Sequence, residues 1–212
     1  QRTAAICGMA AIVGSVFHSS IGGGIFAVEI IQKARMGYRD LFPAILSSLT
    51  AVYICKFLGW ESFYTLNAPD VFMDISRVGW LLLLVLLAGV GGAAYTSLYS
   101  MIARLIKRKE GNVTLKIMIG SLIAASLAWA VNPRLLGTSA SFIPALIHGD
   151  WDLLAGRLSG VSSLTLLLCI MLGAKVLCNC ITVGSGMSAG FTGPTAIAGM
   201  LLGAAVSHAA GI

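Results

Sequence analysis

The sequence predicts an all-α integral membrane protein whose transmembrane helices are tilted and broken. Composition is the first observation behind this prediction: of 212 residues, 58% are hydrophobic and only 10% are charged, and the mean hydropathy is +0.92. A soluble domain has about 25% charged residues, so this chain has too little charge to cover a water-exposed surface. The composition excludes a soluble enzyme, a disordered chain and a nucleic-acid-binding module, and we expect no nucleic-acid partner.

The second observation is the uneven length of the uncharged stretches. A helix perpendicular to the membrane needs about 20 apolar residues. Two stretches moderately exceed this length, several fall short of it, and the last is much too long for one span. Such lengths favour tilted helices and helices that break partway through the membrane. The stretches without Asp, Glu, Lys or Arg are 3–28, 41–55, 78–103, 117–133, 135–149, 158–174 and 176–212.

The charged residues between these stretches predict which loops face the cytoplasm. Basic residues dominate 33–39 and 104–116, whereas 61–77 has three acidic residues and one arginine. Because Lys and Arg concentrate in cytoplasmic loops, we expect 33–39 and 104–116 inside and 61–77 outside. One span near 41–60 and one near 78–103 satisfy this alternation. The charges are thus expected to mark loops, and the net charge of +6 reflects them rather than a polyanionic partner.

Glycine and cysteine positions give two further predictions. The 25 glycines cluster at 22–24, 89–92 and 184–203, and small residues of this kind let membrane helices pack closely. The cysteines lie in apolar surroundings and are expected to be buried thiols rather than a disulfide set. They are Cys7, Cys55, Cys169, Cys178 and Cys180. No metal is expected at the last two, because no histidine or carboxylate lies nearby.

The segment 184–195 predicts a binding site rather than simple packing. Four glycines and Pro194 fall within 184–194, inside an uncharged run, and they predict a break followed by a new helix near Phe191. The first amides of that helix lack intrahelical partners, and an anion would satisfy them. Because 176–212 has no charged side chain, such a site would rely on helix ends and backbone amides. The alternative is a kinked span that packs against its neighbours.

Three groups of residues resemble the CLC family of chloride channels and transporters. Gly184-Ser-Gly-x-x-x-Gly-Phe-Thr-Gly-Pro-Thr195 is similar to the family's S-G-x-x-G-G-x-F-x-P segment. Gly8-Met-Ala-Ala-x-x-Gly14 and Phe17-His-Ser-Ser-Ile-Gly-Gly-Gly-Ile-Phe-Ala-Val-Glu29 are similar to its G-A-A-A-G and F-N-A-P-L-A-G-x-x-F-x-x-E segments. Leu136-Gly-Thr and Ile143-Pro resemble a loop early in its second half. The matches occur in the same order and at similar spacing across nearly the whole chain.

The resemblance implies the family's fold, in which two inverted halves of tilted, broken helices form one anion pathway per subunit of a homodimer. Residues 1–212 then correspond to an incomplete transmembrane domain, the end of the first half and the start of the second. The chain starts at Gln1 rather than Met, beside an apolar stretch, and we expect it to be part of a longer polypeptide. The family's gating motif G-x-E-G-P does not occur in this sequence.

The resemblance also implies anion transport rather than enzymatic catalysis, with no cofactor. The backbone amides of Phe191 and Thr192, flanked by Gly190 and Gly193, would bind the central anion. The partners would be chloride or a similar small anion and the lipid bilayer of the plasma (cell inner) membrane. Thr192 occupies the family's usual Phe position and Ala189 replaces a Gly, so fluoride or nitrate stays open as the transported anion.

Ile30 bears on the choice between two transport mechanisms. In the family's proton-coupled exchangers, a proton-transfer Glu follows the Glu that matches Glu29, and here that position is Ile30. Isoleucine has no titratable group, so the resemblance favours a passive, voltage-gated chloride channel. A proton-coupled antiporter on the same fold is the alternative. Glu29 itself is expected to pair with Lys33, four residues further on.

Two patterns point to other chemistry. Gly186-Met-Ser188-Ala-Gly190 fits the G-x-S-x-G pattern of hydrolases and is followed by His208, so an intramembrane serine protease is a remote alternative. His148-x-Asp150-x-Asp152 has the residue types of a metal site but is interpreted as a polar loop between apolar runs. His18 has no neighbouring ligand residue in the sequence and is interpreted as a packing or interfacial residue.

Overall fold

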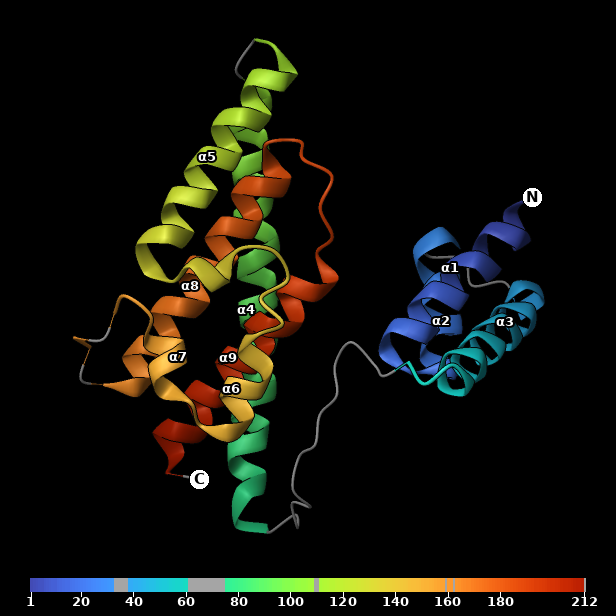
Figure 1. Ribbon diagram of the computed structural model, residues 1–212, viewed down its shortest axis with the longest axis horizontal. Coiled ribbons are helices and arrows are strands. Elements are labelled where there is room, and N and C mark those ends of the chain that lie inside the picture. The colour runs from blue at the N-terminus through green and yellow to red at the C-terminus, as the bar shows by residue number, and fades with distance from the viewer. Residues whose placement is uncertain (33–37, 61–74, 109–110, 159, 162, 212) are drawn as a thin grey trace. The chain divides into compact units, whose positions relative to one another are not determined.

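The computed structural model describes residues 1–32, 38–60, 75–108, 111–158, 160–161 and 163–211. These residues form helices and connecting segments without a β-strand, which confirms the predicted all-α class. The chain divides into two compact units, Gln1–Asn67 and Ala68–Ile212. Figure 1 shows the helices of both units.

Three helices form the first unit: α1 (Arg2–Phe17), α2 (Ser20–Gln32) and α3 (Tyr38–Phe57). Each contacts the other two, and they enclose an apolar core of Ile6, Ala10, Ala27, Val28 and Ala44. At His18 the chain turns out of α1 with φ 49°. Helices α1 and α2 have 16 and 13 residues, so each is shorter than the roughly 20 residues of a full span. The prediction of broken helices is therefore met by α1 and α2 of this unit.

Two glycines let the helices of the first unit approach closely. A Cβ atom added to Gly24 would lie 2.8 Å from the Ile45 Cα atom, and one added to Gly23 would lie 2.7 Å from the Gly14 Cα atom. The predicted packing role is therefore confirmed for Gly23 and Gly24. In the other clusters, several glycines would place an added Cβ more than 4 Å from other described atoms and show no such role. They are Gly89, Gly91, Gly92, Gly199 and Gly203.

The second unit is arranged around α8 (Leu164–Gly184). This helix contacts α4 (Ile75–Arg108), α5 (Val113–Val131) and α9 (Thr192–Ala210). In its most apolar window 44% of the residues are buried, against 17% or less in the other helices of spanning length. Helix α8, orange in Figure 1, is thus the centre on which the second unit packs.

Three short helices connect α5 to α8: η1 (Pro133–Leu135), α6 (Phe142–His148) and α7 (Trp151–Ala155). The buried Asn132 fixes this connection. Its Nδ2 donates to the carbonyl oxygens of Leu153 and Leu154 at 3.2 and 3.1 Å, while its Oδ1 accepts from the Arg134 amide at 3.0 Å. One side chain therefore holds the start of the connection against α7.

Four described helices are long and apolar enough to cross a membrane, over residues 38–57, 78–108, 113–131 and 164–184. With 34 residues, α4 is about 51 Å long at 1.5 Å per residue, which exceeds the roughly 30 Å of a hydrocarbon core. Its basic end, with Lys107 and Arg108 in the last turn, is helical. The predicted loop at 104–116 is therefore shorter than expected, while most of 61–77 lies outside the described residues.

The expectation that charges mark loops is wrong at Lys175. Helix α8 runs through this position without interruption, and the side chain is only 2% exposed. Hydrophobic neighbours along α8 and hydrogen bonds from another segment keep the helix continuous where the charge pattern predicted a boundary. A charged side chain therefore lies at the centre of the second unit.

Candidate anion-binding site

The predicted break between two helices is present at residues 185–191. Helix α8 ends at Gly184, and the Ser185 amide bonds to the Ile181 carbonyl at 2.9 Å. The chain then passes through Gly186 at φ 100°, a conformation that glycine adopts without steric cost. Helix α9 begins at Thr192. The prediction of a new helix near Phe191 is confirmed.

Backbone amides at the start of α9 have no hydrogen-bond partner among the described residues. The first helical bond runs from the Thr195 amide to the Phe191 carbonyl at 2.9 Å, and Phe191 provides no side-chain cap. The N–H groups of Phe191, Thr192 and Gly193 therefore stay unpaired, and Pro194 has none. They lie at the positive end of the helix dipole.

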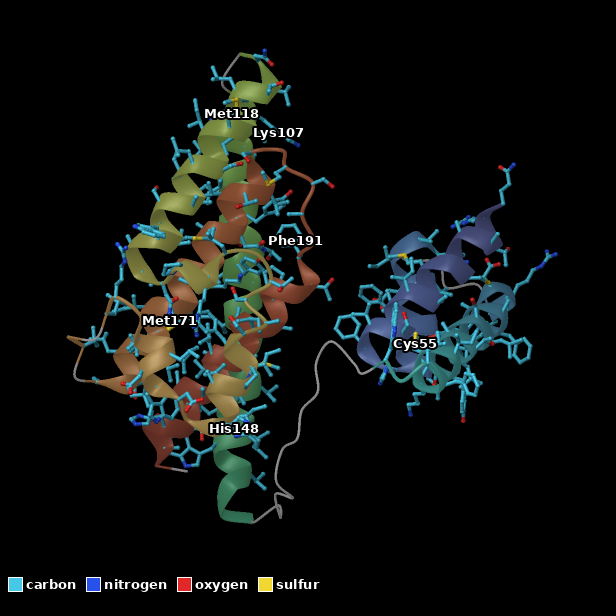
Figure 2. The ribbon with its side chains drawn as sticks, viewed as in Figure 1. Cys55, Lys107, Met118, His148, Met171 and Phe191 are labelled. Carbon is cyan, nitrogen blue, oxygen red and sulfur yellow. The ribbon has the colours of Figure 1, made fainter. Side chains whose placement is uncertain are left out.

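Aromatic contacts hold this helix start in place. The Phe191 ring packs edge-on against Tyr99 and Tyr95 of α4, with ring centroids 5.0 and 6.0 Å apart. Tyr95 also accepts a hydrogen bond from the Asn179 side chain of α8. Figure 2 shows Phe191 where the chain enters α9. The three helices are thus tied together beside the unpaired amides.

A cavity of about 300 Å³ lies at the same helix start. Its lining comes from the η1–α6 segment, from α5 and α8, and from the first residues of α9. Gly190, Thr192 and Gly193 line it, whereas Phe191 does not. The remaining lining residues are Ala124, Leu135, Leu136, Gly137, Thr138, Lys175, Cys178, Asn179, Thr182, Ala189 and Pro194.

Lys175 is the charged side chain of this lining. Its ammonium group donates three hydrogen bonds, to the Leu135 carbonyl at 2.9 Å, the Gly137 carbonyl at 2.7 Å and the Ser139 hydroxyl at 2.6 Å. These bonds attach the segment 135–139 to α8. Residues 176–212 themselves have no charged side chain, so the expectation that an anion held by this segment relies on backbone amides stays a prediction, and the buried cation next to the segment is an addition to it.

Comparison with known proteins identifies the family. A sequence profile described as voltage gated chloride channel matches residues 1–212. The chain belongs to the voltage-gated chloride channel family. The predicted resemblance is thereby confirmed, and four apolar helices of spanning length agree with a membrane protein.

Three relatives show similarity at low identity. The chain is 27% identical over 204 residues to a protein of Ralstonia nicotianae named as a ClcB-like chloride channel protein, covering 96% of this chain and 44% of that protein. An uncharacterized protein of Methanocaldococcus jannaschii is 24% identical over 95% of this chain and 49% of its own length. A chloride/fluoride channel protein of Pseudomonas syringae pv. tomato is 23% identical over 62% of this chain and 29% of its own length. The chain spans less than half of each relative. No solved structure matches it.

In this member of the voltage-gated chloride channel family, Ile30 lies in the first unit, near the end of α2. Its side chain is 49% exposed. Glu29 is also exposed. The expected partner of Glu29, Lys33, lies outside the described residues.

The serine protease pair is not assembled in this structure. Ser188 lies in the break before α9, and His208 lies near the opposite end of that helix. Sixteen helical steps separate Thr192 from His208, which is about 24 Å at 1.5 Å per residue. The His208 ring is instead bonded through Nδ1 to the Thr165 hydroxyl at 2.9 Å.

Among the described residues, no three His, Cys, Asp or Glu side chains gather as metal ligands. The cysteines are free thiols, and Cys178 and Cys180 are buried as predicted, whereas Cys169 is exposed.

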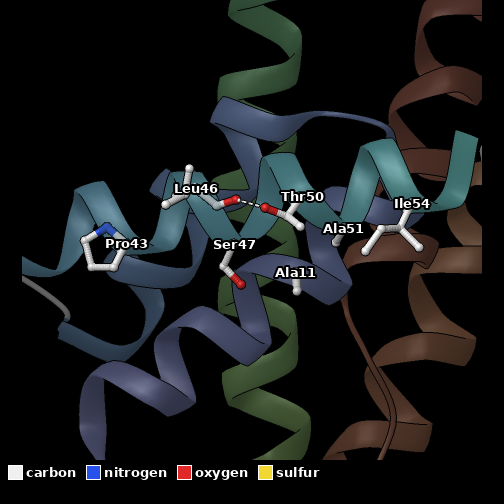
Figure 3. Close-up of a pocket in the computed structure, with 7 residues that line it drawn as sticks. All are labelled: Ala11, Pro43, Leu46, Ser47, Thr50, Ala51 and Ile54. Atoms are coloured by element: carbon white, nitrogen blue, oxygen red, sulfur yellow. Dashed lines mark hydrogen bonds between the residues drawn. The ribbon is translucent and has the colours of Figure 1, made fainter. Parts of the chain in front are cut away.

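An open apolar groove of about 450 Å³ runs along α3 in the first unit (Figure 3), where the Thr50 hydroxyl donates to the Leu46 carbonyl.

Sequence reasoning missed Lys175, Tyr95 and Tyr99 as site residues. Lys175 gave one usable signal, since an ionisable residue between two long apolar runs is a functional candidate by default. The two tyrosines gave none. They lie roughly a hundred residues before Phe191 in the sequence, and only the packing of α4 against α9 brings them to it.

Proposed function

We propose that this protein transports chloride or a similar small anion across the plasma (cell inner) membrane, with the cavity at the start of α9 as a binding site on the pathway. The observation that supports this most strongly is the set of unpaired amides of Thr192 and Gly193 on a cavity whose wall includes Lys175. The two amides lie at the positive end of the α9 dipole, and Lys175 adds a positive charge to the same wall. No carboxylate is found among the described residues of the cavity lining.

Backbone donors suit a conducted ion because they bind it without trapping it. An N–H dipole holds an anion more weakly than a full charge, and conduction requires binding that still permits exit. Neighbouring helices keep the donors in position, so the protein does not reorganise for each ion. The proposed assembly is a homodimer with one such pathway per subunit.

A passive, voltage-gated channel is the mechanism we favour over proton-coupled exchange. Ile30 cannot transfer a proton, and the described part of the cavity lining contains neither a carboxylate nor an imidazole. The name of the Pseudomonas relative makes fluoride a second candidate anion. The proton-coupled antiporter remains the competing mechanism for the test below.

Reconstituted vesicles distinguish these mechanisms. The protein at its natural length is placed in liposomes with an outward chloride gradient and an internal pH dye, and chloride efflux is followed with an electrode. We expect chloride efflux on addition of a potassium ionophore, with no proton movement beyond that of empty vesicles. Uphill proton transport driven by chloride contradicts the channel. Repeating the efflux with fluoride and nitrate ranks the anions.

Replacement of the Thr192 amide by an ester tests the binding site. Incorporating the α-hydroxy acid analogue of threonine removes one N–H and leaves the side chain unchanged. A hydrogen bond to a charged group contributes about 1.5–3 kcal/mol, so we expect chloride affinity, measured by calorimetry, to fall by about tenfold or more. The same ester at Ser188, outside the cavity lining, is the matched control. Equal affinity of the Thr192 ester and the unmodified protein contradicts the proposed site.

A further inference from the structure

The hydrogen-bonding capacity of Lys175 is filled by neutral groups. An ammonium group has three N–H donors, and here they go to two carbonyl oxygens and one hydroxyl. These acceptors replace water around the ammonium without cancelling its charge. The side chain is only 2% exposed, so solvent does not screen this charge either. A positive charge is therefore buried in the centre of the second unit.

No described carboxylate balances this charge. In the second unit the described acidic residues are Asp150 and Asp152, and both are exposed. All partners of the Lys175 ammonium are neutral oxygens, and the sequence has no acidic residue after Asp152. Removing an ion from water is costly, and a well-placed counter-charge offsets part of that cost. The charge of Lys175 therefore has no counter-charge among the described residues.

The cavity provides the place for that negative charge. Lys175 lines the same space as Thr192 and Gly193 of α9. Building on the function proposed above, we propose that the anion in this cavity is the counter-charge of Lys175. The positive charge of Lys175 strengthens anion binding, although its ammonium group donates no hydrogen bond to the ion. The three donors are already occupied, so the interaction acts across the cavity by electrostatic attraction.

The segment that holds the ammonium has an unusual backbone. Ser139 has φ 59°, a left-handed conformation that is unfavourable for a residue other than glycine, whereas Gly137 adopts φ 67° without steric cost. Because the Leu135 and Gly137 carbonyls turn their oxygens toward Nζ, the bonds to Lys175 hold both the cation and the segment in one arrangement. A fixed charge of this kind lowers the energy of a bound anion without rearrangement at each binding event.

Substitutions that separate charge from hydrogen bonding test this role. The protein at its natural length is purified in chloride-free buffer, and chloride binding is measured by calorimetry. Lys175→Gln keeps two N–H donors for the segment but removes the charge. Lys175→Arg keeps the charge, and Ser139→Ala removes one acceptor while the charge stays. We expect the chloride Kd to rise about tenfold or more in Lys175→Gln and to change by less than about threefold in Lys175→Arg and Ser139→Ala.

The possible results separate the inference from the proposed function. Unchanged chloride affinity in Lys175→Gln overturns the inference, and so does an equal loss in Ser139→Ala, because the segment rather than the charge would then matter. If Lys175→Gln does not fold, the wild-type protein supplies the test: chloride must raise its melting temperature, and a transporting wild type without this shift overturns the inference. Absence of anion flux in the wild type instead overturns the proposed function.

Discussion

Gly24→Val is expected to cause a large loss of stability in the first unit. An added Cβ atom at Gly24 would lie 2.6 Å from Ile45 Cγ1, 2.8 Å from its Cα and 2.9 Å from its amide nitrogen. Two of these atoms belong to the backbone of α3, so no side-chain rotation relieves the clash. Helices α2 and α3 must separate, and we expect a destabilisation of about 3 kcal/mol, the upper end for overpacking.

The matched control for this substitution is Gly8→Val. Gly8 lies in α1 of the same unit, is exposed, and has no atom within 4 Å of an added Cβ. The melting temperature of the protein in detergent is the measurement, followed by light scattering or intrinsic fluorescence. We expect a large decrease for Gly24→Val and a change of less than about 0.5 kcal/mol for Gly8→Val. Equal melting temperatures of the two variants would show that α2 and α3 do not pack as described.

Gly120→Ala is expected to damage both stability and the anion site. The added Cβ would lie 2.4 Å from Ser185 Cβ and 2.7 Å from its Oγ. Ser185 is buried, and its hydroxyl donates to the Thr182 carbonyl at 2.7 Å, so it has little room to yield. Because Ser185 begins the break before α9, its displacement shifts the helix start. We expect a destabilisation of about 1–3 kcal/mol together with weaker chloride binding.

A double-mutant cycle identifies the cause of this loss. Ser185→Gly removes the atoms that Gly120→Ala would strike, so the double variant is expected to lose less stability than the sum of the single losses. Gly173→Ala in α8 is the matched control, since an added Cβ there meets no described atom within 4 Å. Melting temperature and chloride calorimetry are measured on the four proteins of the cycle and on the Gly173→Ala control. Strict additivity of the two single losses would refute direct contact between Gly120 and Ser185.

The break before α9 was predictable because its causes are local. Glycine and proline favour particular backbone conformations at their own positions, whatever surrounds them. Four glycines and Pro194 in 184–194 therefore predicted both the interruption and the new helix near Phe191. The break at His18 has no such residue, and the helix ends there in a left-handed conformation that the sequence alone did not predict.

The charged residues predicted the protein class and the connection between α4 and α5, but not every helix boundary. Scarcity of charge predicts a membrane protein, because apolar side chains must face lipid or each other. It did not predict which cation is buried. The charge pattern predicts a boundary at Lys175, yet α8 passes through it, and three hydrogen bonds satisfy the ammonium group inside the fold.

The sequence by itself determined that this chain is an α-helical membrane protein with a broken helix before Pro194, since apolar content and backbone preference are properties of residues and their immediate neighbours. Only the tertiary structure decided what lies beside that break. The acceptors of Lys175 come from 36 to 40 residues earlier, and Tyr99 of α4 reaches Phe191. Such pairings depend on which helices pack together, and this is set by the burial of whole helix surfaces rather than by any short stretch of sequence.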